Sequence, residues 1–410
     1  MVVKIKAFIF ILLIINLVSG LVFSYSVLAQ TKQGDVNYFS RPWKIATDSE
    51  GKFIYVINRR GNNLTVLDSK NLQVIKKIPV GRSPEGIAVD LDNDLIYLAN
   101  RWSFDLTVID GEKITTIPLG NELGRQPRDV KINENLNTIY VLNSESRSLS
   151  IIDANELVLV QTIEINRSVS NFFINRNNNK IYITNYLENS VTVIDADDNY
   201  KTGIIEVGLN PRHLAFLEAT NTLYVTNYNS DNISVINSEI DKEVKRIPTR
   251  AGPSAIAVNS VIGKIYVSNF LDESITVIDA LTEETERIAL PVGAFPGSLA
   301  INEKLNKIYV PNTGINNISV INGEDNTIIA TVASGVSTNR MIFDSINNKA
   351  YAVNPQSNNI TIIDGNTDKS VIIPVSADPQ LIIGTGNIFS SPKGIAIDKR
   401  NNKIYVLNNT

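Results

Sequence analysis

One phrase recurs along this chain at a nearly constant interval. A tyrosine in an apolar run is followed three residues later by asparagine, as in "IYVIN" at 54–58. The first eight of these tyrosines are 42 or 43 residues apart, and the ninth follows after 54. A period of this size is typical of architectures in which each unit buries its apolar surface against its neighbours. The tyrosines are Tyr55, Tyr97, Tyr140, Tyr182, Tyr224, Tyr266, Tyr309, Tyr351 and Tyr405.

Each unit contains four short runs rich in β-branched residues. In the second unit these are "PEGIAVD" at 84–90, "LIYLAN" at 95–100, "LTVID" at 106–110 and "TTIPLG" at 115–120. Asn, Asp, Gly and Pro separate the runs, and no helical period is present, so each run is predicted to be a strand. Four strands in about 42 residues match one blade of a β-propeller. A single four-stranded sheet cannot bury both faces, whereas a closed ring of sheets does so and leaves only short edges.

The second and third runs resemble those of a known family. "LYVTNYNSDNISVIN" at 223–237 and "IYITNYLENSVTVID" at 181–195 are similar to the repeats of YVTN proteins, and the resemblance covers residues 41–410. It implies a β-propeller, often seven-bladed, in an exported or cell-surface protein of archaea or bacteria. This chain departs from that number, because it holds eight complete units and half of a ninth. We therefore predict an all-β propeller of eight four-stranded antiparallel blades, with seven or nine blades as alternatives.

The half unit leaves three interpretations open. Residues 377–391 lengthen the connection before it and include "QLIIG" at 380–384, which could form an extra strand. The chain could be a fragment of a longer protein, which we favour because a half blade has an unpaired edge. Its two strands could instead close the ring against residues 35–40, or form a spare hairpin.

The first 29 residues have the pattern of an export signal. A basic start is followed by the apolar stretch 7–18 and by "SVLAQ", which offers a cleavage site after Ala29. An uncleaved anchor is the alternative. Either case predicts that the remainder is extracellular or at the cell surface. We divide the chain into a signal peptide at 1–29, a short segment at 30–40 that could contribute a ring-closing strand, and the propeller at 41–410.

Composition excludes several classes of function. Beyond residue 29 the chain has 36 basic and 42 acidic residues, a net charge of −6, which argues against nucleic-acid binding as its main role. It has no cysteine and one histidine, His213, so disulfides, thiolate metal sites and haem or metal centres with several histidines are excluded. Trp43 and Trp102 are the only tryptophans, so the tryptophan motifs of quinone-dependent propeller dehydrogenases are missing. We predict no cofactor and no metal.

Two motifs that resemble functional sites are explained by turns of the repeat. The aspartates of "DLDND" at 90–94 lack the glycine and glutamate that an EF-hand loop requires, so we expect a turn there. N-glycosylation sequons recur just before the third run, where a turn residue followed by the strand consensus generates N-[IL]-[ST] by itself. Glycosylation of an exported protein remains a prediction at these positions. The candidates are Asn63, Asn166, Asn232, Asn317 and Asn359, with a further sequon at Asn408.

Basic residues gather in two kinds of loop. In a propeller, the connections from the second to the third strand share one face with those from the fourth strand to the next blade. We call this the loop face. Many arginines and several aromatics fall in these loops, with fewer acidic residues, so an acidic protein could carry a basic funnel for carboxylate, sulfate or phosphate groups. The predicted binding residues are Arg60, Arg101, Trp102, Arg128, Arg212 and Arg340.

The sequence thus predicts a non-enzymatic exported scaffold that binds protein or anionic glycan through its loop face. No catalytic residue is assigned. The alternative is an extracytoplasmic enzyme, lactonase-like or lyase-like, with its site at the mouth of the channel. That alternative expects His213 to lie close to a carboxylate such as Glu85 or Asp129, because a general base needs an orienting partner.

Overall fold

The structure is a computed structural model that describes residues 41–90, 92–120, 122–165, 167–375, 392–398 and 403–408. The predicted signal peptide, the segment 30–40 and the extra strand expected at 380–384 lie outside these residues. Within the described residues, no helix is long and apolar enough to cross a membrane.

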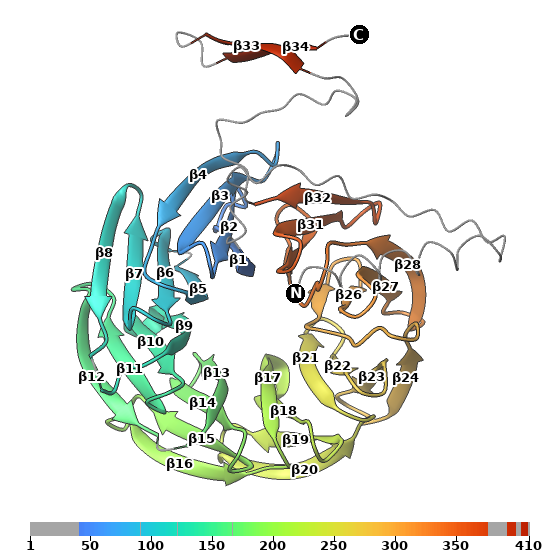
Figure 1. The fold of residues 1–410 in the computed structure, drawn as a ribbon. Helices are drawn as coiled ribbons and strands as arrows, with labels where there is room; N and C mark the ends of the chain where they lie inside the picture. The colour runs from blue at the N-terminus through green and yellow to red at the C-terminus, as the bar shows by residue number, and fades with distance from the viewer. Residues whose placement is uncertain are drawn as a thin grey trace, which may run out of the picture. The chain divides into compact units, whose positions relative to one another are not determined.

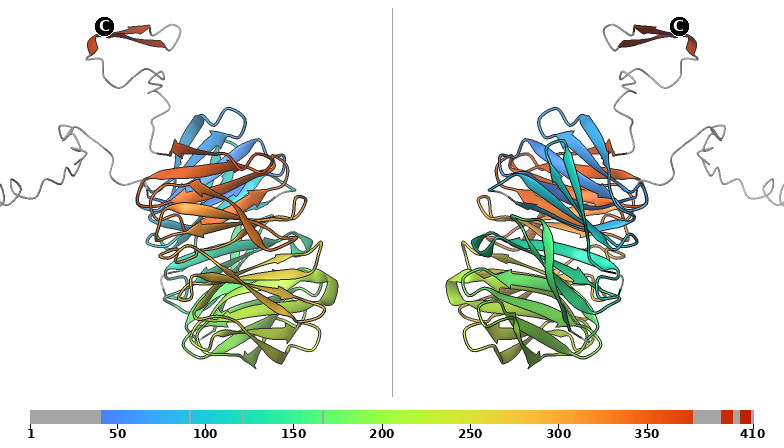
Figure 2. Two further views of the ribbon diagram at one scale, coloured as in Figure 1. Left: turned by 90° about the vertical axis from the view of Figure 1, so that its right-hand side faces the viewer. Right: turned by 90° about the vertical axis from the view of Figure 1, so that its left-hand side faces the viewer.

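Among the described residues, thirty-two strands form eight four-stranded antiparallel sheets arranged in a ring around a central axis (Figure 1). Every sheet consists of four strands that are consecutive in the sequence, which confirms the predicted eight blades. Figure 2 shows the same blades from the side. Blades 1 to 4 comprise β1 Pro42–Thr47, β2 Phe53–Asn58, β3 Asn63–Asp68 and β4 Val74–Pro79; β5 Pro84–Asp90, β6 Leu95–Asn100, β7 Asp105–Asp110 and β8 Lys113–Pro118; β9 Pro127–Asn133, β10 Thr138–Asn143, β11 Ser148–Asp153 and β12 Val158–Glu164; β13 Val169–Asn175, β14 Lys180–Asn185, β15 Ser190–Asp195 and β16 Lys201–Glu206.

Blades 5 to 8 continue in the same order, and a hairpin follows. They comprise β17 Pro211–Leu217, β18 Thr222–Asn227, β19 Asn232–Asn237 and β20 Lys242–Pro248; β21 Pro253–Asn259, β22 Lys264–Asn269, β23 Ser274–Asp279 and β24 Thr285–Ala289; β25 Ala300–Asn302, β26 Lys307–Asn312, β27 Asn317–Asn322 and β28 Thr327–Ala333; β29 Arg340–Asp344, β30 Lys349–Asn354, β31 Asn359–Asp364 and β32 Ser370–Pro374. The half unit forms a two-stranded sheet of β33 Pro392–Asp398 and β34 Lys403–Asn408. Two short 3-10 turns, η2 Glu134–Leu136 and η3 Glu218–Thr220, replace simple turns after β9 and β17.

Strand position within a blade determines burial. The first strand lines the channel and the fourth lies at the rim, as Figure 1 shows for β5 and β8. Second strands such as β2 are buried along almost their whole length, which explains their unbroken apolar runs. Fourth strands such as β16 are mostly exposed. The sheets therefore bury their two faces against neighbouring blades, and the fourth strands are the most exposed to solvent.

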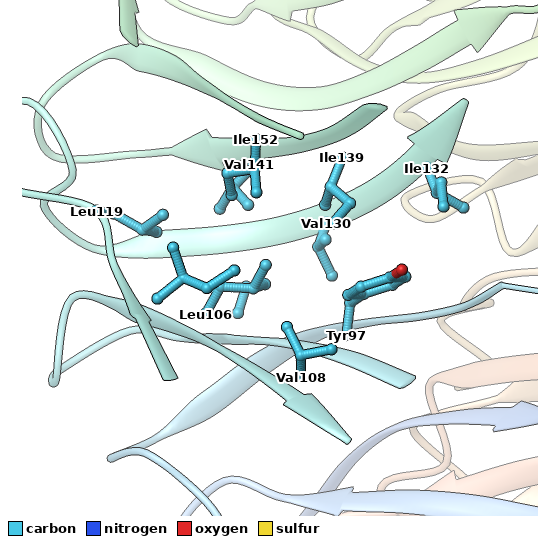
Figure 3. Close-up of a cluster of buried hydrophobic side chains, with 11 residues drawn as sticks. Tyr97, Leu106, Val108, Leu119, Val130, Ile132, Ile139, Val141 and Ile152 are labelled. Atoms are coloured by element: carbon cyan, nitrogen blue, oxygen red, sulfur yellow. The ribbon is translucent and has the colours of Figure 1, made fainter. Parts of the chain in front are cut away.

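Eight apolar clusters hold the ring together, and each contains residues from two adjacent blades. In the cluster between blades 2 and 3, Tyr97 and Leu106 meet Val130 and Ile139 (Figure 3). The cluster that closes the ring joins Ile54 and Leu67 of blade 1 to Tyr351 and Ile360 of blade 8. Blades 1 and 8 share no strand, so among the described residues the ring is closed by this apolar packing and by hydrogen bonds that involve side chains, such as that from Lys349 Nζ to the Ser69 carbonyl oxygen at 2.9 Å.

The asparagine of the repeated phrase ties the second strand to the third in every blade. In blade 5, Asn227 is fully buried, and its Nδ2 donates to Asn232 Oδ1 at 2.8 Å and to Ser234 Oγ at 2.9 Å. The residue before each third strand has a positive φ of 51–58°, a conformation that asparagine and aspartate tolerate. Four sequon asparagines lie directly after this residue and accept the same bond, so their side chains have a structural role that accounts for the recurrence. They are Asn63, Asn232, Asn317 and Asn359.

The repeated tyrosines of the eight blades are buried, but their hydroxyl groups differ in their partners. The Tyr182 hydroxyl donates to Asp241 Oδ1 at 2.8 Å. The buried Tyr266 hydroxyl makes no hydrogen bond within the described residues. We expect Tyr182→Phe to lower the free energy of unfolding by about 1–3 kcal/mol, because a bond to a charged group is lost. Tyr266→Phe, the matched control, should change it by less than about 0.5 kcal/mol. Equal effects in urea denaturation would contradict this assignment.

Candidate binding site at the channel mouth

In six of the eight blades, the first strand begins with an irregularity that places side chains in the channel. The pairing between first and second strands shifts register just after the strand begins, as between Pro42 and Lys44 or between Pro211 and Leu214. Such β-bulges re-aim side chains and are frequent beside functional sites. The residues at the bulges in β1, β5, β9 and β17 include Trp43, Lys44, Glu85, Arg128, Asp129, Arg212 and His213.

These residues line a cavity of about 680 Å³, which we call the channel mouth. Arg59 and Arg101, from the loops after β2 and β6, join them together with Arg340 of β29. This arrangement confirms that the two kinds of loop share one face. The cavity is lined by six cationic side chains, Lys44, Arg59, Arg101, Arg128, Arg212 and Arg340, and by two carboxylates, Glu85 and Asp129. Its lining has a net charge of +4 in a protein whose formal net charge is −4.

Glu85 neutralises part of this charge. Its side chain is only 3% exposed, and Oε1 contacts Arg59 Nη2 at 2.5 Å and Arg101 Nη1 at 2.9 Å. Arg101 also donates from Nε and Nη2 to Gln126 Oε1. Arg59 and Arg101 come from neighbouring blades, so this carboxylate joins blades 1 and 2 at the mouth. Both guanidinium groups are therefore held in place by the protein itself.

Lys44 and Asp129 form a second ion pair, from blade 1 to blade 3. The pair passes blade 2 beside Gly86, where a Cβ atom would lie 2.8 Å from the Asp129 Cα. Burial favours the neutral form of Asp129, but the charges of Lys44 and Lys131 outweigh it and hold its pKa below the usual range. Burial lowers the pKa of Lys44, against the effect of Asp129. The close approach of the blades at Gly86 allows this pair to form.

Three arginines at the mouth have no carboxylate partner among the described residues: Arg128, Arg212 and Arg340. Arg212 lies over the Tyr228 ring at 3.4 Å and donates to Asn210. Arg340 lies over the Trp43 ring at 4.0 Å and donates to the Trp43 carbonyl oxygen. Burial, followed by repulsion from Arg128, lowers the pKa of Arg340 to about 10. The mouth therefore holds positive charge that an anion could compensate.

Trp43 organises this side of the mouth. Its ring contacts the guanidinium groups of Arg59 at 4.6 Å and Arg340 at 4.0 Å, and that of Arg41 lies 5.7 Å away. Cation–π contacts of this kind restrain the guanidinium planes and leave their edges available for hydrogen bonding. Trp43 therefore pre-positions arginines from blades 1 and 8 at the point where the ring closes.

His213 also lines the mouth, but it does not join a carboxylate. Its Nδ1 contacts the Ser254 carbonyl oxygen, which can only accept, so Nδ1 carries the proton and Nε2 is an acceptor. The ring reaches channel water yet is surrounded by protein, and this burial lowers its pKa to about 4, aided by nearby arginines. Within the described residues it makes no hydrogen bond or ion pair with Glu85 or Asp129.

The predicted binding residues fall into two places. Arg101, Arg128, Arg212 and Arg340 line the channel mouth. Arg60 and Trp102 line a neighbouring hollow with Arg41, Arg59 and Ser83, and Arg59 also lines the mouth.

The six predicted binding residues did not include Trp43, Lys44 or Arg59, although Lys44 and Arg59 were among the basic residues assigned to the loop face. The signal that could have found the first two is their place just after the proline that begins a first strand, which is where the bulge forms. Of the other candidates, Asn166 lies outside the described residues. Asp90 accepts hydrogen bonds from the backbone of Asp92 and Asn93, as a turn residue does. No group of potential metal ligands occurs among the described residues.

Comparison with known proteins adds the fold to this picture. No protein-family model and no curated protein matches the chain. A structure of Kuenenia stuttgartiensis hydrazine synthase aligns with a TM-score of 0.56 and 18% identity, over 82% of this chain and 98% of that chain. The dihydro-heme d1 dehydrogenase NirN in complex with DHE aligns with a TM-score of 0.67 and 15% identity, over 81% of this chain and 75% of that chain. Virginiamycin B lyase from Staphylococcus aureus aligns with a TM-score of 0.55 and 16% identity, over 67% of this chain and 92% of that chain. These similarities support a β-propeller repeat protein.

Proposed function

We propose that this chain is an exported β-propeller of the YVTN type that binds an anionic ligand at the channel mouth. Three arginines without carboxylate partners, gathered in one cavity, carry the proposal. The volume of about 680 Å³ is within the range of sites that hold a small molecule or one end of a larger one. The ligand would be a carboxylate-bearing or sulfate-bearing group of a glycan or protein at the cell surface.

The physical basis is the strength of guanidinium–oxyanion contacts. Arginine binds carboxylate and sulfate in a planar, two-bonded geometry, and partial burial strengthens the contact relative to water. Repulsion between Arg128 and Arg340 already lowers the pKa of Arg340, so an anion between them would relieve an unfavourable interaction. The remaining arginines, Arg59 and Arg101, are occupied by Glu85 and would contribute less. Export of the chain is the part of the proposal that rests on residues 1–29.

Arg128→Ala combined with Arg212→Ala should weaken binding to a sulfated polysaccharide by about 100-fold or more, because two charge-assisted contacts are lost. The measurement is calorimetric titration with a short sulfated oligosaccharide at several salt concentrations. Native binding should weaken as salt rises. The matched control is Arg246→Ala, which removes an arginine paired with Glu243 on the outer strand β20. Equal affinities for the native protein and the double variant would refute the site.

A second candidate is an enzyme that uses His213 of the cavity lining as its base, with the Ser254 carbonyl oxygen as the orienting partner of Nδ1 in place of the expected carboxylate. The similar virginiamycin B lyase is catalytically inactive when one histidine is replaced by alanine, so a propeller of this shape can depend on one histidine. The expected result is lactone hydrolysis or elimination that rises through pH 4 to a plateau, because His213 must be neutral to accept a proton. A pH-stat assay of the native protein against His213→Asn tests this. Activity that survives the substitution would exclude His213 as the base.

A further inference from the structure

The channel changes character below its mouth. After the bulge, the first strands present mostly apolar side chains to the channel and to the neighbouring blade. A second cavity, of about 550 Å³, lies along β5, β9, β13 and β17. Its lining includes Ile87, Val89, Val130, Ile132, Phe173 and Phe216, together with Lys131 of β9 and polar residues that follow β13 and β17. We call it the lower channel. Ile87 lines both the lower channel and the mouth, so the two cavities adjoin.

The aromatic part of the lower channel is formed by Phe173 and Phe216. Their ring centroids are 5.2 Å apart with an interplanar angle of 29°, and both side chains are half-buried. Half-buried aromatic rings leave apolar area in contact with channel water, which is unfavourable unless something covers it. Three charged groups also line it: Arg176 is paired with Glu134 at 2.6 Å, Glu218 accepts a hydrogen bond from Asn177, and Lys131 lies over the Phe172 ring with its charge acting on Asp129. The lower channel therefore offers an apolar stretch beside charged groups that already have partners.

We propose that the ligand of the channel mouth is an amphipathic organic anion. Its carboxylate or sulfonate group lies against Arg128, Arg212 and Arg340, and its apolar part extends along the channel to Phe173 and Phe216. This inference rests on the proposed function, because it assigns the anionic end of the ligand to the same arginines. It adds a requirement that no purely polar anion meets: the ligand has an alkyl or aromatic portion that the lower channel removes from water.

Strand geometry fixes the reach of such a ligand. Arg212 and Phe216 lie four residues apart on β17, which corresponds to about 13 Å at the rise of a β-strand. A compact anion such as sulfate cannot contact both. An elongated molecule can, since the two cavities meet at Ile87. The structure thus favours an unbranched or flat apolar group over a bulky one.

The test is a calorimetric titration with a homologous series from ethanesulfonate to octanesulfonate, kept below micellar concentrations. Each added methylene should tighten binding about fourfold while it enters the lower channel. Phe173→Ser should weaken octanesulfonate binding at least tenfold and leave ethanesulfonate binding unchanged, which also shows that the variant is folded. Val89→Thr is a milder variant at another residue that lines the lower channel, and it should also weaken octanesulfonate binding. Leu281→Ser, at a side chain that is 91% exposed, is the control and should change neither affinity.

The outcomes separate the two proposals. Sulfonates that all bind with one affinity, in a manner that depends on Arg128 and Arg212, would overturn the amphipathic ligand and leave anion binding intact. Chain-length dependence that persists unchanged in Phe173→Ser and Val89→Thr would place the apolar contact elsewhere and also overturn it. Failure of every sulfonate and of inorganic sulfate to bind would overturn both. Loss of chain-length dependence in the two lower-channel variants alone supports the inference.

Discussion

Replacing Glu85 with alanine should lower the free energy of unfolding by about 3–5 kcal/mol, because the change leaves two partly buried guanidinium groups without their shared carboxylate. Arg59 and Arg101 would then face each other across the mouth with Arg340 close by. The repulsion can be relieved only if side chains withdraw into solvent or if an anion enters. Urea denaturation, with and without added sulfate, measures the loss.

The control for this prediction is an ion pair of the same chemistry at the surface. Glu50 and Lys52 contact each other with side chains that are 59% and 62% exposed. Glu50→Ala should therefore change stability by less than about 1 kcal/mol. Sulfate should recover part of the stability of Glu85→Ala and none for Glu50→Ala, because only the first variant enlarges an anion site. A Glu85→Ala protein as stable as Glu50→Ala would show that the mouth does not need its internal carboxylate.

Ile360→Ala should open the ring where blade 8 meets blade 1. Ile360 is fully buried in the cluster that closes the ring, and truncation to alanine costs about 2–5 kcal/mol in a packed core. No peptide connection or shared strand supports this interface among the described residues. We expect amide exchange in β1 and β30 to accelerate by about 30-fold or more, since 1.4 kcal/mol corresponds to a factor of ten.

The matched variant is Ile275→Ala, which removes the same side chain from the same position of β23 in blade 6. Its cluster joins blades 6 and 7, which the chain also connects covalently. The equilibrium cost should be similar, but the local exchange around β23 should rise less than that around β1 in Ile360→Ala. Equal local effects measured by hydrogen exchange would show that the covalent connection adds nothing to the blade interface.

The fold could be predicted because its information is local and repeated. Tyrosine, asparagine and the turn residues recur at one spacing, and each has the same role in every blade, as Asn227 illustrates with its two buried hydrogen bonds. The number of blades followed from the number of complete units. The sequence predicted a closed ring but left open whether the half unit takes part in closing it, because nothing in the repeat distinguishes the interface between blades 1 and 8 from the others.

The site could be predicted only in outline, because it depends on what differs between blades. The repeat position of the arginines identified those of the loop face, and four of the six predicted binding residues line the mouth. The ion pairs could not be predicted from the sequence. Lys44 pairs with Asp129, which is 85 positions away, and Glu85 pairs with Arg101, which was predicted to bind a ligand. Arg60 and Trp102 lie in the loops that were predicted to form the site, but their side chains line a different hollow. Such partners are determined by which blades the ring brings together, and a local pattern does not encode contacts between residues that are far apart in the sequence.

The coincidence of the repeat unit with the blade has a consequence for engineering. Since each blade is built from four strands that are adjacent in the sequence, cutting the chain between any two blades and joining residues 41 and 375 by a linker leaves every sheet intact. Circular permutants with new ends after Pro118 or Pro248 should therefore keep all eight sheets. In each permutant, a different pair of neighbouring blades lacks a covalent connection. A set of permutants would therefore allow the position at which the ring closes to be chosen.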